Sequence, residues 1–472
     1  MRYCLIFIVC LLPLVTQAQV EKPMTWDSLL GLVLQHHPVA LQAEYVQQSG
    51  EQGVRRARGA FDPQLFGYYD QKQFKDTDYY RLLDAGLKVP TWFGVELKTG
   101  FEQNQGVYVN PEATTPTDGL LYAGISLPLA QGLLMDDRRA SLRQAQLMEK
   151  MTEAEQLLML NRLVEQIAID YYAWWEAYYQ RKVYEEALAL AKVRLEAIRA
   201  GFLQGDRPAI DTVEAYLQWQ TRLVAWNEAQ LKWTKTSLTL SNHLWYDGLV
   251  PMELEESTFP RVSIQAEAPM QMTEDSLLMF RKEIIQNHPE LQQYQWKIEQ
   301  LGFEQRLKAE KLKPKVNLSY NFLSERTGVP LAENVGAFNS NDYKWGLTVS
   351  MPLLLREGRG DWQITKLKVK EAQADRMQKW VSIENKWLSA YAETQTLYRQ
   401  AGIYSQALSN YQQLLNAENR RLEIGESNLF MVNAREMSLI SAQIQWAKVR
   451  SQYEVSRIQW ICASGRATEY LP

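Results

Sequence analysis

Apolar residues recur every seven positions over 208–245, in two series that are two residues out of step. The first series is Ile210, Leu217, Val224, Leu231, Leu238 and Trp245, and the second is Trp219, Trp226, Trp233 and Leu240. At about 100° per residue the two series lie on nearly opposite sides of one helix. Two stripes indicate neighbours on both sides, as in a closed ring of helices, whereas one stripe would indicate a two-partner coiled coil. A helix buried in a large bundle is the alternative, but polar flanks between the stripes favour the ring.

Two further helical patterns are much longer than a globular helix. They cover about 139–200 and 363–421, and at 1.5 Å per residue each would reach roughly 90 Å. Each doubles back at a turn that contains a glycine, Gly205 in the first case and Gly425 in the second. Glycine suits the end of a helix because it adopts a left-handed backbone without strain. The stretch 427–462 then repeats the doubly striped pattern of 208–245.

Short segments with alternating polarity predict β-strands between the helices. "LYAGISLPL" sets Leu121, Ala123, Ile125 and Leu127 against small or polar residues, and "YKWGLTVSM" does the same with larger apolar ones. A soluble sandwich would show this alternation too. However, strands of about ten residues with aromatic ends are also typical of a transmembrane barrel. Asn- and Gly-rich stretches at 104–119 and 324–342 look like exposed loops at one end of such a barrel.

The chain is an internal duplication. "LQHHPVALQAE" (34–44) returns as "IQNHPELQQYQ" (285–295), and from Tyr171 onward residues match partners 220 positions later for about 90 residues. The first half carries an insertion of 27 residues, which includes an extra hairpin at 87–103. Only four strand segments match between the halves, and an open sheet edge in hydrocarbon is costly. If these strands span a membrane, several chains must therefore combine to close one barrel.

These patterns predict an α+β membrane protein with a signal peptide, two repeats and a linker. The expected parts are: 1–18, signal peptide; 19–245, first repeat, with strands at about 61–74 and 120–129, the hairpin 87–103, and long helices 139–200 and 208–245; 246–273, equatorial linker; 274–462, second repeat, with strands at about 314–323 and 343–353 and long helices 363–421 and 427–462; and 463–472, C-terminal tail.

Composition narrows the function classes. The apolar run Leu5–Val15 followed by "TQA" has the pattern of a secretory signal, with a retained anchor as the less favoured alternative. Cys4 and Cys10 would leave with it, so Cys462 would have no partner for an internal disulfide. A formal charge of −4 without a basic patch argues against nucleic acid.

The adjacent histidines His36 and His37 suggest a metal site at first sight. In the second copy they correspond to Asn287 and His288, so only one histidine and the following proline recur. A residue before proline avoids helical geometry, while proline suits the first turn of a helix. The motif is therefore interpreted as a break between two helices. We expect no metal site, no cofactor and no enzymatic activity, because no catalytic or ligand cluster is evident.

The order of these features resembles the TolC family of outer-membrane efflux proteins, over nearly the whole chain after the signal. The resemblance implies a homotrimer in which each chain gives four strands to a twelve-stranded outer-membrane β-barrel. The long helices would continue this barrel as an α-helical coiled-coil barrel across the periplasm. It also implies a passive exit duct, which works with a periplasmic adaptor protein and an inner-membrane pump.

By the same resemblance, the glycine turns form the periplasmic tip, where the adaptor docks and the duct closes. Docking candidates at the helix tips are Phe202, Gly205, Leu422 and Gly425. The family often carries aspartates at the second tip, but here Asn433 and Glu436 stand there, which puts a tight cation ring in doubt. The candidates for the aperture are Asp211, Glu426, Asn433 and Glu436, with solvated turn residues as the alternative.

The function expected is the outer-membrane channel of a tripartite efflux system, of the RND or ABC type, or of a type I secretion system. The alternative is a soluble periplasmic coiled-coil scaffold whose strands form a small sandwich. The sequence leaves open the substrate, the type of pump, the gating residues, and whether the 87–103 hairpin joins the barrel.

Overall fold

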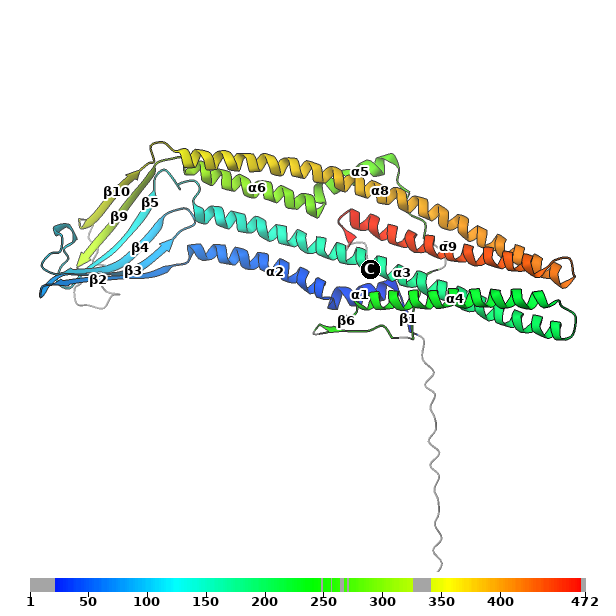
Figure 1. Cartoon of the computed structure of the whole chain (residues 1–472). Helices are drawn as coiled ribbons and strands as arrows, with labels where there is room; N and C mark the ends of the chain where they lie inside the picture. The colour runs from blue at the N-terminus through cyan, green and yellow to red at the C-terminus, as the bar shows by residue number, and fades with distance from the viewer. Residues whose placement is uncertain are drawn as a thin grey trace, which may run out of the picture. The chain divides into compact units, whose positions relative to one another are not determined.

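The computed structural model describes residues 22–247, 249–255, 257–263, 267–269, 271–325 and 341–467 (Figure 1). The expected signal peptide, most of the 324–342 loop and the last five residues of the tail lie outside this part of the chain. The contacts divide the chain into two compact units. A helical unit takes in 1–41, 160–272 and 387–472, and a sheet unit takes in 42–159 and 273–386.

The sheet unit contains one antiparallel sheet of six strands. In chain order these are β2 (Gln64–Phe74), β3 (Thr77–Pro90), β4 (Glu96–Gln105), β5 (Leu120–Pro128), β9 (Lys315–Glu325) and β10 (Tyr343–Ser350). Their order across the sheet is β10-β9-β5-β4-β3-β2. The two repeats thus share a sheet at the β5–β9 contact, where Ile125 lies opposite Tyr320.

The extra hairpin of the first repeat belongs to this sheet. β3 pairs with β2 along eleven residues, and β4 pairs with both β3 and β5, so both strands of the hairpin are interior strands of the sheet. The β2–β3 turn is tight because Lys75 and Asp76 both have positive φ, at 47° and 57°, as a two-residue hairpin turn of right-handed twist requires. The described part of the chain therefore places six strands in this sheet: the four that match between the repeats and the two of the hairpin, whose place the sequence left open. The prediction from repeat matching missed β3's first half, which has no counterpart in the second repeat.

Helices of the sheet unit connect to one end of the sheet. α2 (Pro38–Arg58) leads through the short 3-10 helix η1 (Gly59–Phe61) into β2, and α6 (Pro289–Glu310) leads into β9. The chain leaves β5 and β10 toward α3 (Asp137–Leu203) and α8 (Arg356–Glu423), which each continue into the helical unit. A second 3-10 helix, η2 (Pro111–Ala113), lies in the loop between β4 and β5.

Each His-Pro pair separates two helices. α1 (Trp26–His36) ends before Pro38, and α5 (Glu274–Asn287) ends before Pro289. His37 Nδ1 accepts a hydrogen bond from the amide of Val39 at 3.1 Å, and His288 Nδ1 accepts one from Glu290 at 3.2 Å. Burial lowers the pKa of each imidazole to about 4, so both are neutral. In each copy, the histidine that directly precedes the proline thus caps the helix that follows.

The helical unit is built on a core that joins α1, α3, α4 (Ala209–Ser241) and α9 (Leu429–Ala463). Trp174 of α3 is fully buried, stacks on Trp233 of α4 and donates to Ser237 Oγ at 3.0 Å. The Tyr171 hydroxyl donates to the carbonyl of Met24 at 2.9 Å, and burial raises its pKa. This aromatic core accounts for part of the chain's many tryptophans.

Short strands lie in the linker and near the N-terminus. β1 (Lys22–Met24) pairs in parallel with β8 (Thr258–Pro260), and β6 (Trp245–Tyr246) pairs with β7 (Val250–Pro251). The linker is also held by side chains, because the Tyr391 hydroxyl accepts from the amide of Met272 at 3.1 Å.

The two apolar stripes of α4 differ in how much of their surface is exposed. The second stripe faces the core of the chain, since Trp233 and Leu240 are buried. The first stripe lies open on the single chain, with exposed fractions from 56% to 68% at Ile210, Leu217, Val224, Leu231 and Leu238. The two apolar stripes of α9 differ in the same way near the start of that helix, where Val432 is buried and Phe430 is 67% exposed. An apolar stripe this regular indicates a surface that another helix covers.

Among the helices that the structure describes, none is both long and apolar enough to cross a membrane.

Candidate functional site at the helix tips

The two glycine turns have the same backbone design. Gly205 follows α3 and Gly425 follows α8, with φ of 82° and 80°. Gly205 donates to the Phe202 carbonyl at 3.0 Å and Asp206 to the Gly201 carbonyl at 3.0 Å. The second turn repeats this pair of bonds from Gly425 to Leu422 and from Glu426 to Arg421. Both are Schellman motifs, which satisfy the last carbonyls of a helix through a left-handed residue.

The helices that follow the two turns begin differently. α9 has Asn428 as its N-cap, and the side-chain oxygen accepts from the amide of Met431 at 3.0 Å. α4 has Pro208 in the same place, which offers no side-chain acceptor. Because a capping Asn contributes about 1 kcal/mol relative to a residue without an acceptor, the start of α9 is held more firmly than that of α4.

A small apolar cluster holds the two tips together within the helical unit. Leu195 and Ile198 of α3, Ala215 of α4 and Leu429 of α9 are buried there, and Trp219 packs against them. Beyond this cluster the tips are open and apolar. Exposed fractions are 43% at Phe202, 84% at Leu203, 68% at Ile424 and 67% at Phe430.

A buried polar network lies next to this cluster. Arg194 of α3 donates through one nitrogen to Asn433 Oδ1 at 2.8 Å and to Glu436 Oε2 at 2.6 Å, both on α9. Asn433 in turn donates to Glu214 of α4 at 3.4 Å. Asn433 and Glu436 are only 4% and 5% exposed, while the Arg194 side chain is 26% exposed. One cation thus links three helices of both repeats.

A second buried carboxylate lies at the turn between α8 and α9. Glu418 is 6% exposed; it accepts a short hydrogen bond from Ser427 Oγ and lies 3.7 Å from the Arg435 guanidinium. This arrangement fixes the turn from within the same repeat.

The predicted aperture residues therefore fall into two groups. Asn433 and Glu436 lie inside the chain in the Arg194 network. Glu426 is exposed and 4.0 Å from Arg421, and Asp211 is partly exposed and 3.8 Å from Arg207. The predicted docking residues Phe202, Gly205 and Gly425 are exposed, and Leu422 is half-buried.

Sequence reasoning missed Arg194, Glu214 and Glu418. The sequence did contain a signal for two of them, because each is a charged residue whose matched position in the other repeat, 220 residues away, is apolar. Arg194 corresponds to Leu414, and Glu418 corresponds to Ile198. A charge that replaces an apolar residue at a matched position of a duplication marks a place where the two copies have different contacts.

The histidines give a weaker site. His243 lies 2.7 Å from the Asp170 carboxylate, and its ring centroid is 5.6 Å from that of His37. Beside His243, burial keeps His37 neutral, with a pKa of about 4. Within the described ranges no group of three or more His, Cys, Asp or Glu residues is placed to hold a metal ion.

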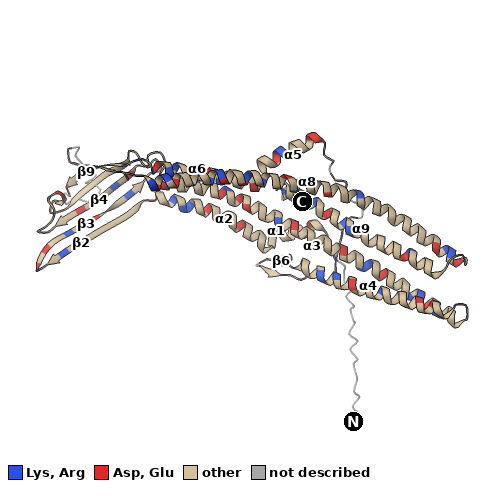
Figure 2. Ribbon diagram, turned by 45° about the horizontal axis from the view of Figure 1, so that its top comes forward, with Lys and Arg blue, Asp and Glu red and all other residues tan. Residues whose placement is uncertain are grey.

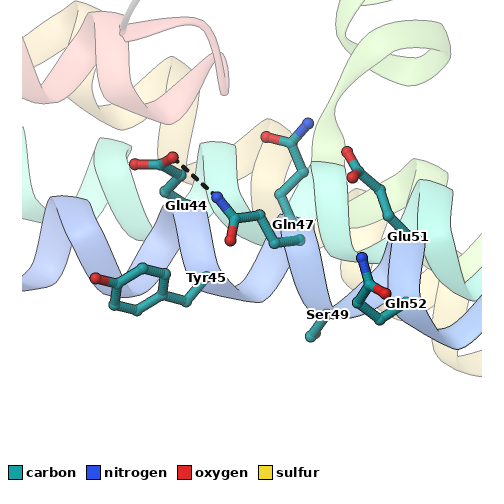
Figure 3. A pocket seen from close by; sticks show the side chains of 7 residues that line it. Glu44, Tyr45, Gln47, Ser49, Glu51 and Gln52 are labelled. Carbon is teal, nitrogen blue, oxygen red and sulfur yellow. Dashed lines mark hydrogen bonds between the residues drawn. The ribbon is translucent and has the colours of Figure 1, made fainter.

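A hollow on the surface of α2 is not a ligand site. It has a volume of roughly 600 Å³ and is lined by seven residues of this one helix, from Glu44 to Gln52 (Figure 3). Glu44 accepts from Gln48 at 3.0 Å within it. A hollow with one wall does not enclose a ligand, which usually loses most of its surface to a pocket.

Comparisons with known protein families and solved structures give matches to outer-membrane efflux proteins and channels. Residues 280–466 match the model of the family described as outer membrane efflux protein. A comparison with curated protein sequences gives no significant match. The resemblance to the outer-membrane efflux family is therefore confirmed by the second repeat and, as fold, by the solved structures.

Three solved structures illustrate the likeness. The CmeC outer membrane channel of Campylobacter jejuni has 13% identity and a TM-score of 0.64, over 94% of this chain and 86% of that one. The outer membrane protein VceC of Vibrio cholerae has 15% identity and a TM-score of 0.62, over 93% and 96%. The open state of the MtrE outer membrane channel of Neisseria gonorrhoeae has 13% identity and a TM-score of 0.60, over 93% and 88%.

Proposed function

Because its second repeat matches the outer membrane efflux protein family, we propose that this chain forms an outer-membrane channel, the exit duct of an efflux or secretion system. The observation that carries the proposal is the joint match of family and fold, since channels of the outer membrane resemble the chain over more than nine tenths of its length. The chain supplies a passive conduit from the periplasm to the exterior. It is not an enzyme.

The duct is a homotrimer whose sheets form a transmembrane β-barrel and whose helices form a periplasmic coiled-coil barrel. The open stripe on α4 supports this assembly, because five apolar side chains at seven-residue spacing stay more than half exposed on one chain. Covering them with a neighbouring helix would remove apolar surface from water at about 25 cal/mol per Å². Each chain would contribute helices with partners on both sides.

The helix tips close the duct and receive a periplasmic adaptor protein. Phe202, Gly205, Leu422 and Gly425 are the docking candidates, and their open, partly apolar surroundings suit a protein partner. The inner-membrane pump that the adaptor reaches is of the RND or ABC type and supplies the energy.

The aperture candidates act in two ways. Asp211 and Glu426 are the acidic residues that would line the opening, because water reaches both side chains. Asn433 and Glu436 act from inside, since their bonds to Arg194 hold α9 against α3 and keep the tip narrow.

Membrane extraction tests the proposal against a soluble scaffold. Cell envelopes are washed with high salt and then extracted with a mild detergent. An outer-membrane channel stays in the salt-washed membrane fraction and is released by detergent. Release by salt, or recovery with soluble periplasmic protein, would refute the proposal and favour the scaffold.

A further inference from the structure

The six-stranded sheet carries an inference about how the channel closes. We propose that three copies close a barrel of eighteen strands, in which β2 of one copy pairs with β10 of the next. The inference rests on the proposed function for its membrane setting and its three copies. The six strands, their directions and the residues on their faces come from the structure itself.

The two edges of the sheet are suited to each other. β2 and β10 are the outermost strands, each with a single neighbour in the described part of the chain. β2 runs away from the end of the sheet that joins the helices, because it follows α2, whereas β10 runs back toward it into α8. An even number of antiparallel strands gives opposite directions at the two edges. β10 of one copy and β2 of the next are therefore antiparallel, and the pattern closes without a break.

Both edges are long and free of proline, and the register shift between β2 and β3 is confined to Lys72/Gln73, close to the turn that joins them. β2 has eleven residues and β10 has eight, and neither contains proline. Soluble proteins blunt such edges with prolines, bulges, short strands or inward charges. In hydrocarbon each unpaired backbone group would cost several kcal/mol. In a closed ring of copies, one neighbour pairs with the β2 edge and the other neighbour pairs with the β10 edge.

One face of the sheet is apolar across all six strands. The register places in one band Leu347 opposite Leu318, Leu318 opposite Leu127, Leu97 opposite Ile125, Val89 opposite Leu97, and Leu65 opposite Leu87. Many of these side chains are open on the single chain, for example Leu347 at 52% and Leu65 at 86%. From Leu83 to Val89 on β3 and from Leu97 to Phe101 on β4, the added strands keep the alternation of the others, which indicates that these parts belong to the same lipid-facing wall.

The opposite face is polar and also continuous through β3 and β4. Lys88 lies opposite Lys98, and Asp84 lies opposite Glu102; the charges of both signs on these strands are seen in Figure 2. The Tyr122 hydroxyl of β5 donates to Asp84 Oδ1 of β3 at 2.8 Å across the intervening strand. Gly100 of β4 makes room for this bridge, because a Cβ there would lie 2.5 Å from the Tyr122 oxygen. A hairpin that lay outside the wall would not need such a contact.

The number of strands sets the width of the barrel. With strands about 4.8 Å apart and tilted about 40°, eighteen strands give a diameter of roughly 36 Å, against roughly 24 Å for twelve. The hairpin therefore widens the outer-membrane segment by about half. It also adds Lys88, Lys98, Asp84 and Glu102 to the polar lining. This end of the duct would admit bulky, polar cargo of either charge.

Cysteine cross-linking tests the seam between copies. In a Cys462→Ser background, Gln64→Cys on β2 is combined in turn with Gly346→Cys, Thr348→Cys or Ser350→Cys on β10, all on the polar face near the helix-connected end. Oxidation of membranes should give covalent dimers and trimers with at least one pair. The matched control is Lys98→Cys with the same partners, because Lys98 lies level with Gln64 on an interior strand and should give none. Absence of cross-linked oligomers in every β2–β10 pair would overturn the seam.

A cryo-EM map of the detergent-extracted protein tests the strand count. Eighteen strands in three copies, with β3 and β4 in the wall, is the expected result. Twelve strands with the β3–β4 hairpin folded outside or inside the wall would overturn the inference and leave the proposed channel standing. A different number of copies, each giving six strands, would overturn the count of eighteen alone. A soluble monomer without a barrel would overturn the proposed function as well.

Discussion

Replacing Arg194 with leucine should loosen the helix tips. Leucine is the residue that the second repeat has at the matched position, Leu414, so the substitution suits the helix and the apolar surroundings. It removes the donor that bonds Glu436 at 2.6 Å and Asn433 at 2.8 Å. Glu436 is 5% exposed, so its carboxylate would be left buried and without its partner.

The expected cost follows from this burial. Breaking a fully buried ion pair by removing one partner costs 3–5 kcal/mol. The Arg194 side chain is 26% exposed, so water already weakens the pair and can reach part of the vacated space. We expect a loss of about 2 kcal/mol in the free energy of opening the tip, which corresponds to roughly a 30-fold change in an equilibrium constant.

Hydrogen–deuterium exchange of the purified protein measures this local opening. Amides in the first turns of α9 and around Arg194 in α3 should exchange roughly 30-fold faster in R194L. Lys192→Ala is the control, because it removes an exposed cation from the same helix at the same charge difference. Adding Glu436→Gln to R194L should restore much of the protection, since it neutralises the stranded carboxylate. Exchange in R194L that matches K192A would refute the assigned role of the network.

Three further results are expected. Gly425→Ala should destabilise the tip by roughly 1 kcal/mol because φ is 80° there. Gly402→Ala, in the exposed interior of α8, should instead stabilise the helix by roughly 0.5–1 kcal/mol. The two variants should therefore shift Tm in opposite directions, and shifts of the same sign would contradict this. Leu231→Asp on the open stripe of α4 should dissociate the oligomer in mild detergent, whereas Gln220→Asp should not, as light scattering would show; an intact L231D oligomer would argue against the stripe as an interface. His288 has a pKa of about 4 in the fold against 6.5 when unfolded, so the unfolded chain binds a proton first as the pH falls. The fold is therefore fully stable in this respect above pH 6.5 and loses up to about 3 kcal/mol in the free energy of unfolding between pH 6.5 and pH 4. His288→Asn keeps a capping acceptor and should lose less Tm over that range than wild type; an unchanged pH dependence would place its cause elsewhere.

The features that repeat along the chain could be predicted from the sequence. The seven-residue stripes of α4 follow from helical geometry, and the buried Trp233 and the exposed Leu231 lie on the faces that the two series predict. Gly205 and Gly425 mark helix ends because a left-handed residue is needed there.

Features that depend on contacts far apart in the sequence could not be predicted in this way. The first half of β3, with Tyr80, Leu82 and Leu83 on its two faces, shows weak alternation and takes its place from pairing with β2 and β4. Arg194 is one of many cations on a polar helix flank until the fold brings Glu436, more than 200 residues away, to its side. Such pairs are set by tertiary packing, which local periodicity does not encode.

The mass of the complex extracted from outer membranes in mild detergent tests the central claim most directly. Native mass spectrometry should find three copies of the chain and no stable single copy, because the open stripe of α4 and the free edges of the sheet need neighbours. A monodisperse monomer recovered from that membrane extract would contradict the account of a channel built from several chains.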